Sequence, residues 1–489
     1  MKIGLVSLGC PKNLVDGEVM LGLAQQAGHE ITPDARDADV IVVNTCAFID
    51  NAKQESIDAI LEMAQYQRDG KRLVVTGCLA ERYRDELKKE IPEIDAVLGT
   101  GEVADIVAAV EGQGRHGRGV TPGAGVQPLT FHAKAAGSAH RRSPAVAQAT
   151  ADKPISDLRS PTSDLRPLPT YIYDADTPRV LTTPKHFAYV KVAEGCDYTC
   201  AFCIIPTLRG EYRSRTRESI VAEARSLAAR GVKELLLISQ DTTFYGIDRR
   251  ERGALAALLR ELNTVDGLEW IRMLYLYPTT ISDEVLAAMA ECDKVCKYID
   301  LPLQHASADV LKRMRRPGNR QTYDTLLARI RNRVPGVTLR TTFIVGFPGE
   351  TEEEFAELEG FVEDTGFDHI GVFTYSHEEG TRAHAAADDV TAAVKRKRRD
   401  RIMTRQQRIV AARQASRIGT EVKILIDGPS PEHELVLQGR LEGQAPDIDP
   451  VVYLTDCDPS VYGRGDLIRA RIVGAQGYDL VASPVGQGV

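Results

Sequence analysis

Short apolar segments alternate with amphipathic helical segments along the first hundred residues, and this alternation is the strongest constraint on the fold. The segments at 2–8, 39–44 and 72–77 are short, apolar and rich in β-branched residues. Between them lie two stretches with helical spacing of apolar residues, each closed by a glycine, at 13–28 and 51–70. A strand–helix–strand alternation of this kind predicts a parallel sheet covered by helices.

The same alternation returns between residues 184 and about 385. Helices separate six strand candidates, which span 187–192, 234–239, 270–277, 297–303, 337–347 and 369–376. Thr351 and Glu354 have the spacing of a capping box at the start of one of these helices. Six units favour an open, partial (β/α)6 barrel over a closed eightfold barrel, and such barrels carry their chemistry at the carboxyl ends of the strands.

Two regions differ from this α/β pattern. Residues 112–183 are rich in Gly, Ala, Pro and Ser without apolar periodicity, which predicts a disordered linker with a little order near 171–176. After a basic helix at 395–417, short strands broken by Gly and Pro predict a small antiparallel β-barrel of the oligonucleotide-binding shape. The three predicted domains are therefore 1–111, 184–415 and 416–489.

The composition is that of a soluble globular protein, with 43% hydrophobic and 27% charged residues in a chain of 489. We find no signal-like N-terminus and no run of about twenty apolar residues, so we expect a cytoplasmic protein without a membrane span. In that reducing compartment, clustered cysteines indicate metal binding or catalysis rather than disulfides. The net charge of −8 argues against a chain devoted to nucleic acid.

Three of the nine cysteines fall within eight residues, directly after the first strand of the second region. Cys196, Cys200 and Cys203, in the stretch "EGCDYTCAFCIIP", offer three thiolates from one loop. This set suits a cubane iron–sulfur cluster whose fourth iron has no protein ligand, and an open iron is a place for chemistry. A closed zinc site needs a fourth ligand, and the remaining alternative is three unligated thiols in a reduced loop.

The form Cys-x3-Cys-x-aromatic-Cys, here "CDYTCAFC", resembles the signature of radical S-adenosylmethionine enzymes. The resemblance implies that Cys196, Cys200 and Cys203 are catalytic ligands of a 4Fe-4S cluster that cleaves S-adenosylmethionine to a 5′-deoxyadenosyl radical. It covers nearly the whole chain apart from 112–183. The stretches "SLGCPKNLVDGE", "NTCAFI" and "TGCLAERY" look like the amino-terminal domain of methylthiotransferases, and the tail looks like their TRAM domain.

Three more cysteines gain a role from this resemblance. Cys10, Cys46 and Cys78 each follow a predicted strand by one or two residues, and the carboxyl ends of parallel strands share one edge of a sheet. Any one of them could instead be an incidental buried thiol. The family motifs favour a second 4Fe-4S cluster, which holds the sulfur to be transferred. The remaining cysteines lack a third ligand beside them and are predicted to be buried or free thiols: Cys292, Cys296 and Cys457.

The resemblance also implies contacts with S-adenosylmethionine at strand ends. The stretch "ISQDTTFYG" follows the second barrel strand, where the family binds the methionine amino group. "TTFIVGFPGETEEEF" follows the fifth strand, where a Gly-rich turn lets backbone approach the adenosyl part, although "GFPGE" alone could be an ordinary turn. "DLPLQHASADVLKRMRR", at 300–316, lies at the end of the fourth strand. The implied cofactor-binding residues are Gln240, Asp241, Gly346, Gly349 and Glu350.

The implied activity replaces an unactivated C–H bond with C–SCH3. Such a bond has no acidic proton, so a radical must abstract the hydrogen. One S-adenosylmethionine methylates sulfur at the second cluster and another supplies the radical at the first. An electron donor such as flavodoxin or ferredoxin and a sulfur donor are the further partners. An iron–sulfur electron carrier or an RNA-binding scaffold is the competing class, but carriers hold their clusters with four protein ligands.

Two acceptors are open to this family: the 2-position of adenosine in transfer RNA, and the β-carbon of an aspartate in the twelfth small-subunit ribosomal protein. The stretches "GCPKN" and "GVFTYSHEEGT" resemble the ribosomal-protein branch. Residues 416–489 carry six basic and eleven acidic side chains, which suits a basic protein better than phosphates. The basic helix at 395–417 favours RNA, although such charge runs are usually solvated. The predicted acceptor is the ribosomal protein, with transfer RNA as the alternative and nucleic acid not required.

Overall fold

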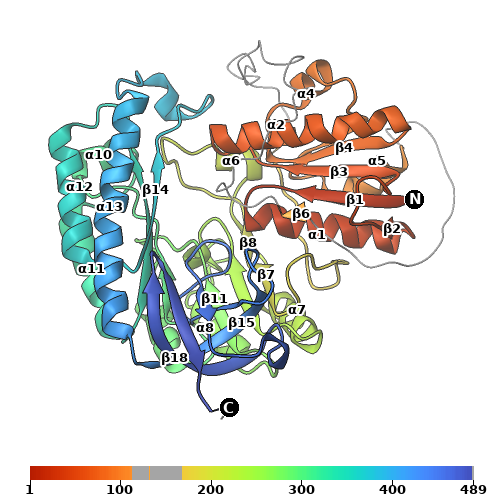
Figure 1. Cartoon of the computed structure of the whole chain (residues 1–489). Coiled ribbons are helices and arrows are strands. Elements are labelled where there is room, and N and C mark those ends of the chain that lie inside the picture. Colours follow the sequence, from red (N-terminus) through yellow and green to blue (C-terminus); the bar gives the residue numbers. More distant parts are fainter. Residues whose placement is uncertain (113–130, 133–167, 487–489) are drawn as a thin grey trace.

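The computed structural model describes residues 1–112, 131–132 and 168–486 (Figure 1). An N-terminal sheet domain, drawn in red and orange, is followed by a half-barrel in yellow to light blue and by a small barrel in dark blue. The fold class predicted from the sequence is confirmed for all three parts. None of the helices in the described ranges combines the length and the apolarity that a membrane span requires.

The N-terminal domain is a parallel sheet covered by helices. Its helices are α1 (Pro11–Gln26), α2 (Asp50–Ala64), α3 (Cys78–Arg82), α4 (Arg84–Glu90) and α5 (Ile106–Glu111). Its strands are β1 (Lys2–Ser7), β2 (Glu30–Ile31), β3 (Val40–Thr45), β4 (Arg72–Gly77), β5 (Ala96–Leu98) and β6 (Phe131–His132). The order is β2-β1-β3-β4-β5, and β6 pairs with β1. Every residue of β3 is buried, because helices cover both faces of a parallel sheet.

The central domain contains six parallel strands: β7 (Phe187–Lys191), β10 (Glu234–Ile238), β11 (Trp270–Met273), β12 (Tyr298–Asp300), β13 (Thr338–Val345) and β14 (His369–Thr374). Two sheets, β7-β10-β11 and β12-β13-β14, adjoin through a bridge between Ile271 and Val295. Within the described strands, β7 and β14 each pair with one neighbour, so the barrel is open, as predicted. The covering helices are α7 (Arg217–Ala229), α8 (Ala254–Asn263), α9 (Asp283–Glu291), α10 (Ala308–Arg313), α11 (Arg320–Arg333) and α12 (Glu352–Thr365).

The small barrel follows a long helix, α13 (Ala392–Arg417). Its five strands are β15 (Glu421–Pro429), β16 (Leu437–Arg440), β17 (Val452–Leu454), β18 (Leu467–Gln476) and β19 (Asp479–Pro484). They close in the order β15-β16-β17-β19-β18. Asp427 binds His186, which precedes β7 (2.7 Å), and Arg440 binds Glu234, the first residue of β10 (2.7 Å). The small barrel therefore covers the amino ends of the half-barrel strands and leaves their carboxyl ends free.

The N-terminal domain contacts both open edges of the half-barrel. Asp16 of α1 binds Lys191, the last residue of β7. Near the other edge, Lys53 of α2 and Arg82 of α3 both bind Glu378, which follows β14 (2.9 Å each). The carboxyl ends of the barrel strands consequently face the N-terminal domain.

At the carboxyl end of the predicted linker, where the sequence predicted a little order near 171–176, the structure describes a packed segment over 168–183. Residues 168–183 lie against the folded domains, where Tyr173 is buried and Arg179 pairs with Glu18 of α1 (2.5 Å). A buried aromatic ring and a paired guanidinium are contacts that stabilise this segment. The domain boundaries stay predictions, and the remainder of the predicted linker lies outside the described residues, at 113–130 and 133–167.

Candidate active site

The three clustered cysteines lie in a loop that follows the first half-barrel strand. This loop runs from β8 (Ala193–Glu194) to α6 (Ile205–Arg209), and β8 pairs with β9 (Arg213–Ser214). Gly195 begins the loop with φ of +85°, and a Cβ there would lie 2.0 Å from the Glu211 carbonyl oxygen, so only glycine fits. In the middle of the loop, the Ala201 amide donates to the Met314 carbonyl oxygen (2.8 Å). Backbone contacts of the protein itself thus shape the loop.

The thiols of this loop are partly buried. Burial raises the pKa of Cys196 to about 11 and that of Cys203 to about 12, so the free thiols keep their protons at neutral pH. Metal binding must displace those protons, since the thiolate is the ligand. Arg316 lies beside the remaining thiol of the loop, with Nη1 3.9 Å from Cys200 Sγ. Its guanidinium carbon lies 4.2 Å from the centroid of the Tyr277 ring. A buried cation next to this sulfur would offset the negative charge of thiolate ligands.

The other predicted ligands lie at one edge of the N-terminal sheet, as the strand alternation predicts. Cys10, Cys46 and Cys78 follow β1, β3 and β4, which are adjacent and parallel. A Cβ built on Gly9 would lie 3.1 Å from Cys46 Sγ, so the loops that carry Cys10 and Cys46 touch. Burial raises the pKa of Cys46 to about 12 and that of Cys78 to about 11, and interaction with Cys10 adds to both.

The donor chemistry of both sets fits a cubane cluster. In the described part of the chain, no three His, Cys, Asp or Glu side chains form a ready site for one metal ion. A cubane cluster does not need such convergence, because each thiolate binds a different iron. Each set offers three thiols from one loop or one sheet edge. Their assignment as cluster ligands stays a prediction.

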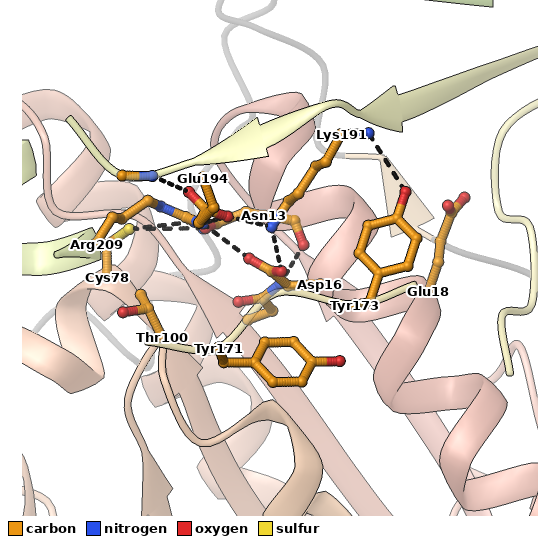
Figure 2. A network of polar contacts seen from close by, with 12 residues as sticks. Asn13, Asp16, Glu18, Cys78, Thr100, Tyr171, Tyr173, Lys191, Glu194 and Arg209 are labelled. Carbon is orange, nitrogen blue, oxygen red and sulfur yellow. Dashed lines mark hydrogen bonds and ion pairs between the residues drawn. The ribbon is translucent and has the colours of Figure 1, made fainter. Parts of the chain in front are cut away.

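A buried polar network joins the two cysteine sets. Arg209, the last residue of α6, points toward the N-terminal domain, where Nη2 lies 3.7 Å from Cys78 Sγ and hydrogen-bonds Asn13 (Figure 2). Its Nη1 binds Asp16 of α1 (3.0 Å) and Glu194 of β8 (2.9 Å). Burial opposes the charge on Arg209, but the two carboxylates hold its pKa well above the ordinary value. The helix that follows one cysteine loop is therefore bound to the sheet edge that carries the other set.

Glu194 links this network to the predicted cofactor residues. Its carboxylate accepts hydrogen bonds from Lys191 Nζ and from Gln240 Nε2 (2.5 Å each). Burial alone would raise the pKa of Glu194, but Arg209 and Lys191 hold it well below the ordinary value. Gln240 Oε1 is buried and has no hydrogen-bond partner among the described residues. An acceptor in that position is suited to a ligand's N–H group.

Asp241 and Glu350, both predicted to contact cofactor, are engaged within the protein. Asp241 accepts hydrogen bonds from the Tyr198 hydroxyl (2.8 Å) and from two backbone amides of the following turn. Glu350 accepts from the Gly346 amide (2.7 Å) and from Arg398 Nη1 (2.8 Å). Both carboxylates hold loops in place, and their contact with cofactor stays a prediction.

Gly346 and Gly349 shape the turn between β13 and α12. Their φ angles are +74° and +73°, which side chains other than glycine rarely adopt. A Cβ on Gly346 would also lie 2.3 Å from Lys395 Cγ. The predicted capping box of Thr351 and Glu354 is confirmed at the start of α12. Approach of a ligand to these glycines stays a prediction.

Sequence reasoning missed several residues that the fold brings to these strand ends. Gln304, which follows β12, has φ of +73° and a buried Oε1 without a hydrogen-bond partner in the described ranges. Backbone strain together with an unpaired buried amide indicates a functional position. The sequence offered only its place in the "DLPLQHAS" stretch. Nothing in the sequence singled out three cations near the cysteines: Lys12, Arg209 and Arg316.

Three family models match successive parts of the chain. Residues 2–99 match the model described as Uncharacterized protein family UPF0004, residues 190–362 match the Radical SAM superfamily, and residues 418–485 match the TRAM domain. Among solved structures, the radical S-adenosylmethionine methyltransferase TsrM from Kitasatospora setae has a TM-score of 0.51 at 16% identity, over 76% of this chain and 72% of that one. At this level of identity the likeness shows a shared fold over about three quarters of this chain and nothing about function.

Full-length relatives carry one name. The ribosomal protein uS12 methylthiotransferase RimO of Koribacter versatilis is 47% identical, over 98% of this chain and 96% of its own. The protein of the same name from Geotalea uraniireducens is 45% identical, over 99% and 98% of the two chains. Identity at this level over whole chains establishes common descent of all three parts together. The chain therefore belongs to the family of RimO ribosomal protein uS12 methylthiotransferases.

Proposed function

We propose that this protein transfers a methylthio group to the β-carbon of an aspartate in ribosomal protein uS12. One observation carries the proposal beyond family membership: Arg209, six residues after Cys203, lies 3.7 Å from Cys78 Sγ. This contact supports the proposal that the two cysteine sets form one continuous site at the carboxyl ends of the barrel strands. A site that generates a radical and donates sulfur to the same carbon needs both functions close together.

Two 4Fe-4S clusters belong to the proposal. Clusters bound there would supply the electron that cleaves S-adenosylmethionine into a radical and the sulfur that the acceptor receives. Each leaves one iron without a protein ligand, which distinguishes the proposed enzyme from an electron carrier. The proposed ligands are Cys196, Cys200 and Cys203 for the first cluster, and Cys10, Cys46 and Cys78 for the second.

The protein's own residues orient the reactants. Gln240 is held by Glu194 through its amide nitrogen, which leaves its Oε1, unpaired among the described residues, available to an N–H group of the cofactor. The contacts of α1 with Lys191 and of Glu378 with α2 and α3 hold the N-terminal domain over the open barrel. A covered site keeps out competing hydrogen donors and so limits side reactions of a reactive radical.

Ribosomal protein is favoured as acceptor by the names of the relatives, which share 44–47% of their residues with this chain. The acidic balance of residues 416–489 is a weaker argument than the sequence suggested. Asp427 pairs with His186 and Arg440, and Asp449 pairs with Arg340, so these acids hold the tail to the half-barrel. An electron donor such as flavodoxin or ferredoxin, a sulfur donor and a cytoplasmic location complete the proposal.

Incubation of anaerobically reconstituted protein with purified uS12, S-adenosylmethionine and a reductant tests the proposed function. We expect a methylthio adduct on one aspartate of uS12, located by tandem mass spectrometry, together with 5′-deoxyadenosine. A matched uS12 variant with that aspartate replaced by alanine should stay unmodified. Formation of 5′-deoxyadenosine without any adduct on uS12 would contradict the acceptor and leave the cofactor chemistry standing.

A further inference from the structure

Lys12 is a buried cation without an acidic partner in the described part of the chain. It lies in the first turn of α1, and the residue is only 7% exposed. Its Nζ lies 3.0 Å from the centroid of the Tyr275 ring. A cation–π contact of this kind stabilises a buried ammonium only modestly and does not replace a counter-ion. A buried charge with no counter-ion is costly, and an anionic ligand would remove that cost.

The carboxylates around Lys12 are bound by other cations. Asp300 pairs with Arg340 (2.9 Å) and accepts a hydrogen bond from the Tyr275 amide (3.0 Å). Asp16 and Glu194, which are both labelled in Figure 2, are shared by Lys191 and Arg209. Within the described ranges, these carboxylates thus neutralise the cations that neighbour Lys12. The Lys12 ammonium is left available to a ligand.

The position of Lys12 relates it to the proposed reaction. It follows Cys10 by two residues, and the Cys10 set is the proposed holder of the transferred sulfur. Its ammonium lies over Tyr275, which follows β11 and has φ of +60°, a strained value for a residue with a side chain. Lys12 therefore stands between the sulfur-bearing sheet edge and the carboxyl end of a barrel strand.

We propose that Lys12 binds the side-chain carboxylate of the acceptor aspartate. This inference rests on the proposed function. In aspartate, the carboxylate carbon is bonded directly to the β-carbon, so an ammonium that holds the carboxylate places the reacting carbon one bond from the anchor. An adenine base is neutral and offers no anion to the ammonium. Lys12 is consequently a specificity-determining residue that favours an acidic side chain over a nucleobase.

The test compares uS12 carrying aspartate with uS12 carrying asparagine at the acceptor position. Asparagine has nearly the same shape and lacks the charge. Fluorescence anisotropy with the cluster-loaded wild-type enzyme should give a Kd for the aspartate form at least about tenfold lower than for the asparagine form. Equal affinities would overturn the assignment, and this arm requires no enzyme variant.

Variants of Lys12 supply the second arm. In K12Q, kcat/KM for aspartate uS12 should fall by about 100-fold, mainly through KM, while the asparagine form should bind equally well to both enzymes. K12R keeps the charge and should keep the preference for aspartate. Lys12 does not bind the acceptor if K12Q prefers aspartate uS12 as strongly as the wild-type enzyme does. The same conclusion follows if the only defect of K12Q is a loss of iron. If wild type leaves uS12 unmodified while it cleaves S-adenosylmethionine, the proposed function fails instead.

Discussion

Each cysteine set has one buried arginine beside a sulfur, and the two arginines differ in their counter-charges. Arg209, next to Cys78, is bound by two carboxylates. Arg316, next to Cys200, donates to a backbone carbonyl oxygen and lies over a tyrosine ring, with no ion pair to a carboxylate found in the described ranges. The positive charge beside Cys200 is therefore the less compensated of the two.

Replacing Arg316 by glutamine should lower the reduction potential of the cluster that we assign to the Cys196 loop. Reduction adds negative charge, and removing a nearby cation disfavours the reduced form. The expected shift is on the order of 59 mV, or tenfold in the one-electron equilibrium. An EPR-monitored redox titration can measure it in protein whose second set, Cys10, Cys46 and Cys78, is changed to alanine. R316K is the control, and a midpoint that does not fall in R316Q would refute this role.

The number of clusters can be counted chemically. Wild-type protein reconstituted without oxygen should bind about eight irons per chain, four for each cubane cluster. Changing Cys196, Cys200 and Cys203 together to alanine should leave about half of that iron. The matched triple variant of the N-terminal set should do the same. Loss of all the iron, or of none, from either variant would show that the two-cluster assignment is wrong.

The cysteines could be predicted from sequence because their positions are local. Each follows an apolar strand, and strand ends of a parallel sheet meet at one edge whatever the rest of the fold does. Arg209 could not be predicted in the same way, since its partner Asp16 lies 193 positions away in the chain. The sequence showed Lys12 only as part of the "GCPKN" motif. Its burial and its lack of a counter-charge among the described residues are properties of the folded chain.

At the scale of elements, the loop between β16 and β17 holds the small barrel to the half-barrel. The Asp449 side chain in this loop is only 1% exposed and binds Arg340 (3.2 Å) and the Tyr298 hydroxyl (2.6 Å). The sequence suggested that acids of this loop face a protein substrate, and for Asp449 the structure shows an internal ion pair instead. The exposed neighbour Asp447 makes a hydrogen bond with the Tyr189 hydroxyl (3.2 Å).

Replacing Asp449 by alanine should destabilise the protein by about 1–3 kcal/mol, because the Tyr298 hydroxyl and the Ala445 amide lose their acceptor while Arg340 keeps its ion pair with Asp300. Denaturant unfolding, followed by circular dichroism, measures this change. D447A is the matched control in the same loop and should cost about 1 kcal/mol or less. Similar losses in the two variants would argue against the buried ion pair as the anchor.

The strands were predictable because a buried parallel strand is a short β-branched run, and all six barrel strands fall within their predicted segments. The sequence predicted a little order near 171–176, but the full extent of the packed segment at 168–183 was not predictable from composition. Its order depends on Tyr173 and Arg179, two side chains whose partners lie on α1 and α7. The average composition of about seventy residues does not show that two individual side chains can hold part of the segment against the folded domains.

At the scale of the whole molecule, Glu378 fixes the N-terminal domain to the edge of the half-barrel. The stretch "SHEEGT" resembled the ribosomal-protein branch, and the structure gives its first glutamate a buried place between Lys53 and Arg82. This residue thus joins the two domains that carry the two cysteine sets.

Changing Glu378 to glutamine should weaken this contact between the domains by about 3–5 kcal/mol, because the buried Arg82 loses the Glu378 carboxylate and Lys53 keeps only the exposed Asp50. Limited proteolysis should then cut between the domains faster than in wild type. D50N removes another partner of Lys53, a side chain that is 67% exposed, and should have little effect. If both variants resist protease as wild type does, the domains are held mainly by other contacts.

The central claim is that one site removes hydrogen from the β-carbon of an aspartate in uS12 and replaces it with a methylthio group. The most direct measurement uses uS12 deuterated at the aspartate β-carbon, with transfer RNA present in the same reaction. We predict that mass spectrometry will find deuterium in 5′-deoxyadenosine in step with a methylthio adduct on that aspartate. Deuterium-free 5′-deoxyadenosine, or an adduct on adenosine of transfer RNA with uS12 unmodified, would contradict the account.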